Sequence, residues 1–376
     1  MWISFARALA ILPSGRLGLY TIATDSNNII KSEDTLIQIA IGLVKKGSTI
    51  DTGGTMPDVR VWNAECDYME GIKLGDGKWV NPGDFEEAKV GSQVPQQMPW
   101  ALFSANENAV CIAQLAATWV DESGYVWLGD WAKECNREWF YSNIYIQGTD
   151  RKTKCQWIDG DGHRDTTGFS VHWPSFTLME DEWPKTLEDE QKLKNYICND
   201  GPYVSYTDVD PHRIYCDRKM HKPGLEHDDF SNKDQVDWKY DQPKEWRPAP
   251  AAGSLVEPLR SGPLHRRGSH RRGEPPQDPS YRNNTHDDWL VVTDDPQHSA
   301  LDLCAHASSR GPNLVNTVEG NYCHMVDKSL WPLCTVDMTD NCFDHEAQIL
   351  IQQGLQARGV QYNTVLDWSG TGERGI

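Results

Sequence analysis

Five segments between Val110 and Phe176 decide the fold: VCIAQLAATWV at 110–120, GYVWLGDWAKEC at 124–135, WFYSNIYI at 139–146, CQWIDGDGHRD at 155–165 and GFSVHWPSF at 168–176. They contain six of the chain's sixteen Trp and three of its ten Cys. Short apolar runs bounded by Gly, Asp and Asn are typical of β-strands, and cysteine pairs can staple such strands together. We therefore predict a β-rich α+β fold, with a disulfide-stapled antiparallel β-sandwich-like core, few helices and long loops.

The composition limits the possible partners and the compartment. A formal net charge of −19 disfavours nucleic acid, because phosphate binding needs clustered Lys and Arg. No run of about 18 apolar residues is present, so we expect no membrane insertion. The ten cysteines form no C-x-x-C pair, which favours disulfides in an oxidising compartment over a metal or redox site. The expected protein is extracellular and needs no cofactor, while its oligomeric state is left open.

The chain divides into four parts. Residues 1–28 form a ragged N-terminus or a degenerate signal segment, because Arg7 and Arg16 interrupt the apolar run. Residues 29–240 are predicted to be a β-rich core domain with an acidic loop region, and residues 241–286 a disordered linker. The stretch from Arg247 to Arg282 within that linker has seven Arg, seven Pro and few large apolar residues. Residues 287–376 are predicted to be a cysteine-rich segment that packs on the core.

Two helices are expected outside the core segments. Ser32 and the acids after it precede an apolar run at 35–44, which ends in two Lys and Gly47. These are helix capping signals, so a helix is predicted there, although the repeated Ile favours a strand. The run from Leu187 to Ile197 predicts a second helix, with Leu193, Tyr196 and Ile197 on one side.

The loop from Asp159 to Asp165 is the first candidate for chemistry. Asp159 and Asp161 alternate with glycines as in calcium loops, but Arg164 and Ser170 stand where an EF-hand needs Gly and an acid. A turn between two hairpin strands explains the same residues, so no metal is expected. His163, Asp165 and His172 are weak candidates for an acid–base pair, because no nucleophile motif accompanies them.

Aromatic residues and acids alternate in the middle of the core stretch. A sugar could stack on Trp127, Trp131 and Trp139. A glycosidase would instead need two carboxylates separated by about 5–9.5 Å. Strands with solvated acidic loops explain the same pattern. The candidate acids are Asp121, Glu122, Asp130, Glu134 and Glu138.

Cysteine spacing does not determine the connectivity, so the expected pairs join neighbours along the chain. Asn283 begins the N-glycosylation sequon Asn283-Asn284-Thr285, which suits an exposed extracellular segment. The expected disulfides are Cys66–Cys111, Cys135–Cys155, Cys198–Cys216, Cys304–Cys323 and Cys334–Cys342.

Two segments resemble uncharacterised secreted cysteine-rich proteins of filamentous fungi. One is the tail GPNLV at 311–315 with YCHM at 322–325, LWPLC at 330–334 and NCFD at 341–344. The other is CQWID at 155–159 with GFSVH at 168–172. The resemblance implies an extracellular location and paired cysteines, and it brings no activity. We expect a secreted non-enzymatic protein that binds a glycan or a protein at a cell surface. The alternative is a secreted glycosidase-like hydrolase that uses paired carboxylates or the His/Asp cluster.

Overall fold

The structure is a computed structural model that describes part of the chain. Predictions for Cys66, Glu122, His163, Cys216 and Asn283, and for the linker except 247–248, lie outside the described residues. The described residues are 5–11, 17–23, 34–42, 54–65, 67–75, 79–80, 85–91, 96–106, 108–121, 123–146, 149–161, 164–176, 186–200, 203–206, 247–248, 288–352, 358–359 and 362–370.

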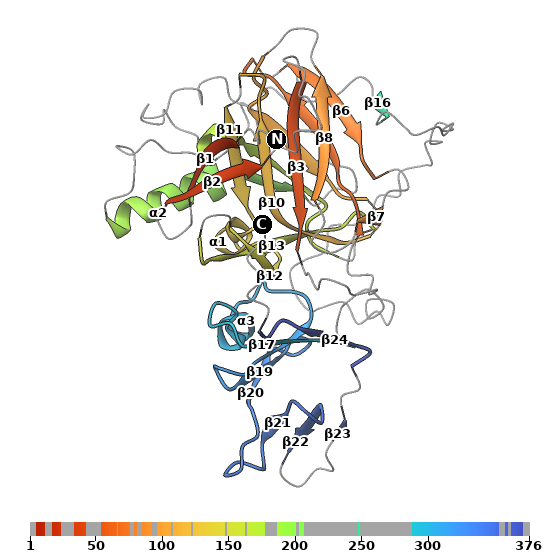
Figure 1. Ribbon diagram of the computed structural model, residues 1–376, viewed down its shortest axis with the longest axis vertical. Helices are drawn as coiled ribbons and strands as arrows, with labels where there is room; N and C mark the ends of the chain where they lie inside the picture. The colour runs from red at the N-terminus through yellow and green to blue at the C-terminus, as the bar shows by residue number, and fades with distance from the viewer. Residues whose placement is uncertain are drawn as a thin grey trace.

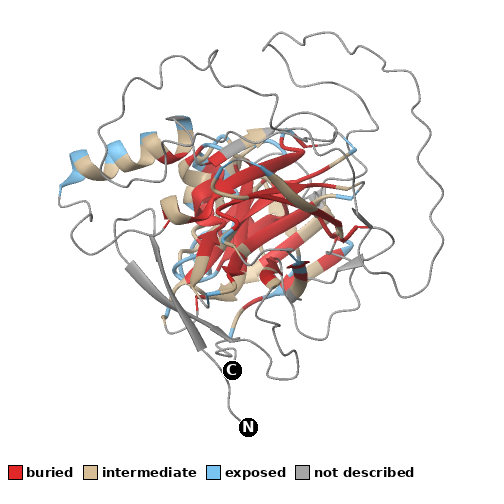
Figure 2. Cartoon of the chain, turned by 90° about the horizontal axis from the view of Figure 1, so that it is seen from above, coloured by how far each residue is buried: buried red, intermediate tan, exposed pale blue. Residues whose placement is uncertain are grey.

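Two largely antiparallel sheets pack face to face and confirm the predicted fold class. Apolar side chains that alternate along the strands of both sheets form one core between them, which Figure 2 shows as the buried centre. Sheet I has the order β12 (Trp139–Tyr145), β13 (Lys152–Ile158), β10 (Val110–Thr118), β3 (Asp34–Ile41) and β8 (Phe85–Gly91), with β11 (Gly124–Leu128) also paired to β10. Sheet II has the order β15 (Tyr203–Tyr206), β14 (Gly168–His172), β9 (Trp100–Ser104), β5 (Asp58–Trp62), β6 (Tyr68–Lys73) and β16 (Arg247–Pro248).

The helix predicted at 35–44 is wrong, because this segment is strand β3. It lies between β10 and β8 in sheet I, with Ile39 opposite Leu115 and Glu86. Most of its side chains are buried on both faces of the sheet, which favours β-branched residues over a helix with one polar side. The capping signals around the segment were therefore misleading.

The N-terminal part contains a small hairpin. Strands β1 (Phe5–Ile11) and β2 (Leu17–Ala23) pair antiparallel, with Leu9 opposite Leu19. The ragged or signal-like segment expected there therefore includes regular structure. Two further short strands, β4 (Gly54–Thr55) and β7 (Trp79–Val80), form a separate two-stranded sheet.

The second predicted helix is confirmed. Helix α2 (Leu187–Asn195) begins with a capping box, in which Thr186 Oγ1 accepts from Asp189 N–H and the Asp189 carboxylate accepts from Thr186 N–H. A π-helical turn, Tyr196–Asp200, follows it. No side chain within α2 is buried, and the helix projects from the sandwich in Figure 2. Three features attach it to the core: partly buried Leu193, the ion pair between Lys194 and Glu134, and the turn that follows.

Residues 288–370 form a smaller unit against the outer face of sheet I, below the sandwich in Figure 1. Leu303 and Leu314 from this unit pack with Trp139 and Trp157 of sheet I. The unit contains α3 (Ala300–Ala305) and two sheets. Sheet III has the order β20 (Ser329–Pro332), β19 (Asn321–His324), β18 (Asn313–Asn316), β17 (Trp289–Thr293) and β24 (Thr364–Asp367), and sheet IV has β21 (Cys342–Asp344), β22 (Ile349–Ile351) and β23 (Arg358–Gly359).

Four disulfides are present among the described residues, and their pairing agrees only in part with the prediction. Cys304–Cys323 and Cys334–Cys342 are the expected pairs. The other expected pairs are wrong, since Cys111 bonds Cys155 and Cys135 bonds Cys198. Cys111 and Cys155 lie on adjacent strands β10 and β13, and Cys198 belongs to the π-helical turn after α2. Sheet order, which sequence spacing does not reveal, brings these distant cysteines together.

The disulfides indicate an oxidising compartment. Among the described residues, no helix has the length and apolar character needed to cross a membrane.

Candidate functional site

The three tryptophans expected to form a binding surface lie in the cores. Trp127 packs on Phe169 between the two sheets, with ring centroids 4.8 Å apart. Trp131 lies edge-on to Phe176 in the same core. Trp139 lies in the core between sheet I and the C-terminal unit. All three are at most 2% exposed, so they cannot form the predicted surface on which a sugar would stack.

The acids between these tryptophans do not converge on one another. Asp130 pairs with Lys154 at 3.1 Å, and Glu134 pairs with Lys194 at 2.8 Å. These ion pairs attach α1 (Asp130–Glu134) to strand β13 and to helix α2. Asp121 lies in an exposed turn, where it accepts hydrogen bonds from Gln97 and Ser123. Of this set, Glu138 alone belongs to the cluster described below.

His172 and Asp165 are held apart by strand β14. Asp165 precedes the first residue of the strand, and His172 is its last residue. The strand itself spans roughly 13 Å at about 3.3 Å per residue. His172 is buried against Trp100, with ring centroids 4.4 Å apart, and its Nδ1 lies 2.7 Å from Ser175 Oγ. The structure therefore does not bring these two candidates together, and His163 lies outside the described residues.

The loop that begins at Asp159 joins the two sheets, so the expected hairpin is wrong: β13 lies in sheet I and β14 in sheet II. Asp159 N–H donates to Thr166 O at 2.9 Å, and Gly160 N–H donates to Asn106 O at 2.8 Å. A Cβ at Gly160 would lie 2.5 Å from that same Asn106 oxygen. Only glycine allows this approach, so the loop is fixed at the end of the sandwich.

Asp159 and Asp161 form a hydrogen-bonded carboxyl pair. Asp159 is 1% exposed, whereas Asp161 is exposed to solvent. Burial is the main cause that raises the pKa of Asp159 to about 7, and the hydrogen bond and negative charge of Asp161 contribute to the same rise. At neutral pH the Asp159 carboxyl is therefore about half protonated.

Arg164 and Glu138 complete the cluster. The Arg164 guanidinium lies over the Trp157 ring, 4.7 Å from its centroid, and its charge acts on Asp159 and on Glu138. Glu138 accepts from Arg310 Nε at 3.2 Å, and burial raises its pKa. Arg164 is 7% exposed, and its Nη2 atom has no hydrogen-bond partner among the described residues. We call Glu138, Asp159, Asp161 and Arg164 the acid–arginine site.

Sequence reasoning found this loop but not the partners that give it its chemistry. In the sequence, Arg164 stands out only because it does not fit the calcium-loop pattern. Glu138 is only one of several acids between the tryptophans. Glu138 lies near this loop because β12 pairs with β13, and the isolated bridge between Trp139 and Ser309 brings Arg310 to Glu138. Within the described residues, no group of three or more His, Cys, Asp or Glu side chains is placed to hold a metal ion.

Comparisons with known proteins identify no family for this chain. No protein-family model matches the chain, and no curated protein sequence matches it. Among solved structures, a crystal structure of a LOX variant matches with a TM-score of 0.23 and 12% sequence identity. The match covers 50% of this chain and 25% of that one. A TM-score this low establishes neither a common fold nor a common function.

Proposed function

We propose that this chain is a secreted, non-enzymatic protein that binds a glycan through the acid–arginine site. The observation that carries the proposal is the Nη2 atom of Arg164, a nearly buried donor without a hydrogen-bond partner among the described residues. A buried donor in this state is expected to meet a ligand or a water molecule. Asp161 of the same loop is exposed, so we place the entry of a ligand from solvent at this residue.

The chemistry of the site favours hydroxyl groups. A sugar hydroxyl can accept a hydrogen bond from Arg164 while it donates one to the carboxylate of Asp161. The Asp159 carboxyl, whose raised pKa keeps part of it protonated at neutral pH, can donate a hydrogen bond, and the carboxyl oxygens of Asp161 can accept one. A purely anionic ligand would be repelled by the acids, and a simple cation by the guanidinium. Neutral polyols satisfy both groups.

A secreted location is consistent with this proposal. The four disulfides connect segments from strand β10 to strand β21, so the described parts of both units need oxidised cysteines. Glycans of cell surfaces and extracellular matrices are the accessible polyols in that compartment. The acidic chain itself disfavours highly sulfated or phosphorylated glycans.

A glycan array followed by calorimetry with the best neutral oligosaccharide tests the proposal. Arg164→Met should weaken binding by at least about tenfold, because a hydrogen bond from a charged group contributes about 1.5–3 kcal/mol. Asp161→Asn should weaken it as well, and Glu188→Gln on the exposed face of α2 serves as the matched charge control. The proposal fails if no neutral glycan binds, or if folded Arg164→Met binds as tightly as the control.

A protein partner at the same surface would be recognised by a different result. Backbone and side-chain amides also donate and accept hydrogen bonds, so a polar protein surface could occupy the acid–arginine site. The glycan array would then show no binding, which counts against the glycan proposal.

The second candidate function is that of a secreted hydrolase. A carboxyl group with a pKa near 7 suits general acid catalysis, and Asp161 would be its partner. Two carboxyls that share a hydrogen bond lie closer than the roughly 5 Å or more that glycosidases use, so this pair favours a proton-sharing dyad instead. A screen of glycoside, ester and peptide substrates tests this candidate. Turnover that disappears in Asp159→Asn but persists in Glu188→Gln would favour the hydrolase over the binding protein.

A further inference from the structure

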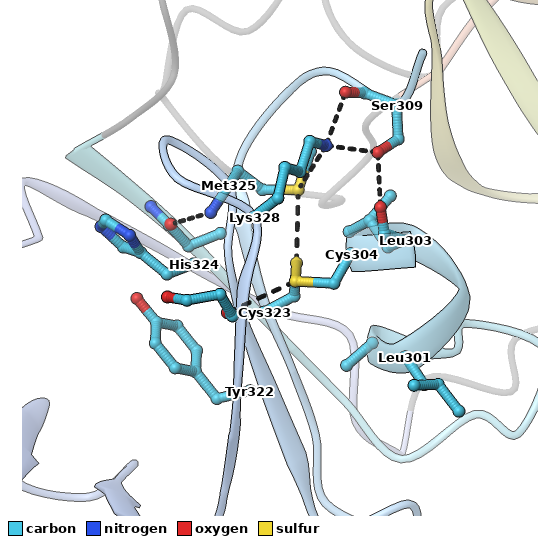
Figure 3. Close-up of a disulfide and its surroundings, with 12 residues drawn as sticks. Leu301, Leu303, Cys304, Ser309, Tyr322, Cys323, His324, Met325 and Lys328 are labelled. Atoms are coloured by element: carbon cyan, nitrogen blue, oxygen red, sulfur yellow. Dashed lines mark hydrogen bonds between the residues drawn. A yellow bond between two sulfur atoms is a disulfide. The ribbon is translucent and has the colours of Figure 1, made fainter. Parts of the chain in front are cut away.

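Lys328 lies in the turn between strands β19 and β20, next to the Cys304–Cys323 disulfide (Figure 3). Its backbone φ is +57°, in the left-handed region that non-glycine residues rarely adopt. This conformation directs the side chain toward Ser309, which belongs to the loop after α3. The turn therefore brings an amine to a specific place in the fold.

Neutral groups surround the amine. Lys328 Nζ donates to Ser309 O at 2.7 Å and lies within hydrogen-bond distance of Ser309 Oγ. The third contact is Met325 Sδ, at 3.5 Å. Ser309 Oγ in turn donates to Leu303 O at 2.5 Å (Figure 3), so it acts as an acceptor toward the amine. None of these acceptors carries the negative charge that usually keeps a buried lysine protonated.

The charged groups around Lys328 do not supply the missing negative charge. The guanidinium of Arg310 lies near enough to disfavour a second positive charge, and His306 also interacts with the amine. Asp327 is the adjacent acid, but its carboxylate accepts from Ser329 N–H at 3.0 Å and lies 2.8 Å from His324 Nδ1. Burial, with a smaller contribution from Arg310, lowers the pKa of Lys328 to about 7.

Two other lysines provide a comparison within the same fold. Lys133 and Lys154 have side chains that are 20% and 21% exposed, and both are partly buried near Trp139. Each faces a carboxylate: Lys133 Nζ lies 2.7 Å from Asp302 Oδ1, and Lys154 Nζ lies 3.1 Å from Asp130 Oδ1. Partial burial alone therefore does not distinguish Lys328. The absence of a carboxylate contact among its described neighbours does.

We propose that Lys328 is a nucleophilic amine site that condenses reversibly with small aldehydes. The lone pair of Nζ attacks the carbonyl carbon and forms a C–N bond, and proton transfer gives a carbinolamine. Loss of one water molecule then yields an imine, so amine and aldehyde become imine and water with no change in oxidation state. Because Lys328 is half-buried, compact aldehydes fit this site better than bulky ones.

The site differs from the acid–arginine site in position and in chemistry. Lys328 belongs to the C-terminal unit, and its contacts are with Ser309 and Met325 rather than with Asp159 or Asp161. The proposal therefore stands whether or not the chain binds glycans. About half of the Lys328 amines are unprotonated at pH 7, against roughly one in 2,500 for an ordinary lysine with a pKa near 10.4.

Reductive methylation of the oxidised full chain tests the proposal. The protein is incubated with ¹³C-formaldehyde and cyanoborohydride at pH 7, and the rate at each lysine is measured by peptide mapping. Lys328 should react at least about tenfold faster than Lys133, Lys154 and the exposed Lys192. Between pH 6 and pH 8 its rate should rise with a midpoint near 7, and Lys328→Arg should remove the fast reaction.

Two controls make the result decisive. In urea the advantage of Lys328 should vanish, because its environment is lost and all lysines return to ordinary reactivity. Above pH 9 the advantage of Lys328 over the exposed Lys192 should shrink, because Lys328 is already unprotonated while the unprotonated fraction of Lys192 still rises. A rate at pH 7 no higher than that of Lys192, or an advantage that persists in urea, would overturn the proposal.

Discussion

At the scale of single residues, Asp159 depends on its surroundings more than any other group in the acid–arginine site. Its carboxyl is buried because Gly160 packs against the backbone of Asn106 and because Asp159 N–H bonds to Thr166 O. These contacts come from three separate segments. The sequence shows an acid-rich, glycine-rich loop, but it cannot show which of the acids is buried.

Asp159 makes stability depend on pH in a defined direction. Its folded pKa is about 7 and its unfolded pKa is near 3.9, so the folded state binds more protons between these values. The free energy of unfolding therefore falls as pH rises from 5 to 8, by at most about 3 kcal/mol for an isolated group.

Asp159→Asn should remove this dependence. Urea unfolding of both proteins at pH 5 and pH 8 measures it, and the difference between the two proteins isolates this group from others that titrate in the same range. The free energy of unfolding of the variant should increase relative to that of the parent protein as pH rises. A difference that stays constant with pH would mean that Asp159 has an ordinary pKa in the fold.

At the scale of elements, strand β3 shows why local signals can fail. Its flanking residues predict helix ends, yet both faces of the strand are buried in sheet I. Helix α2 lies at the surface, and there the same kind of capping signal is correct. Tertiary burial outweighs capping in the first case and does not compete with it in the second.

The disulfide Cys135–Cys198 attaches α2 to the core, and its removal should be costly. It spans 63 residues, whereas Cys334–Cys342 spans 8. A chain-entropy estimate gives about 4 kcal/mol for the longer loop and about 2.5 kcal/mol for the shorter one. The double Cys→Ser variants, compared by urea unfolding, should therefore differ by more than about 1 kcal/mol in that order. Equal losses, or the reverse order, would mean that α2 contributes little to cooperative unfolding.

Much of the secondary structure could be predicted, but the contacts between distant elements could not. Helix α2 and the β-rich core follow from apolar periodicity and turn residues. Cys304–Cys323 and Cys334–Cys342 follow from proximity along the chain. Cys111–Cys155 requires knowledge that β10 and β13 are neighbours. The acid–arginine site likewise depends on strand order, which no periodicity in the sequence encodes.

At the scale of the whole molecule, the sandwich and the C-terminal unit share a buried seam. Trp139 Nε1 donates to His306 Nδ1 at 3.2 Å, and Tyr141 OH donates to Ser299 O at 3.1 Å. His298 is buried in the same seam, with Nε2 at 3.1 Å from Ser142 O and Nδ1 at 3.2 Å from Thr293 Oγ1. A neutral ring satisfies both contacts when Nε2 carries the proton and donates to Ser142 O.

The seam should therefore weaken in acid. Burial lowers the pKa of His298 to about 4, while its unfolded value is near 6.5. The stability from the neutral ring is complete above pH 6.5 and is lost as pH falls toward 4. His298→Gln should remove this dependence, which amounts to about 2 kcal/mol between pH 7.5 and pH 5. Thermal unfolding at both pH values measures it. An equal change of stability with pH in both proteins would show that His298 does not cause the pH dependence.

The proposed site includes the carboxyl pair Asp159 and Asp161 beside Arg164, and the raised pKa of Asp159 is its most directly measurable property. A ¹³C NMR titration of the aspartate carboxyl carbons in the folded protein measures it without knowledge of the ligand. The Asp159 resonance should titrate with a midpoint near 7, and Asp161→Asn should lower that midpoint because the neighbouring negative charge is lost. An Asp159 midpoint near the ordinary carboxyl value of about 4, unchanged in Asp161→Asn, would contradict the proposed site.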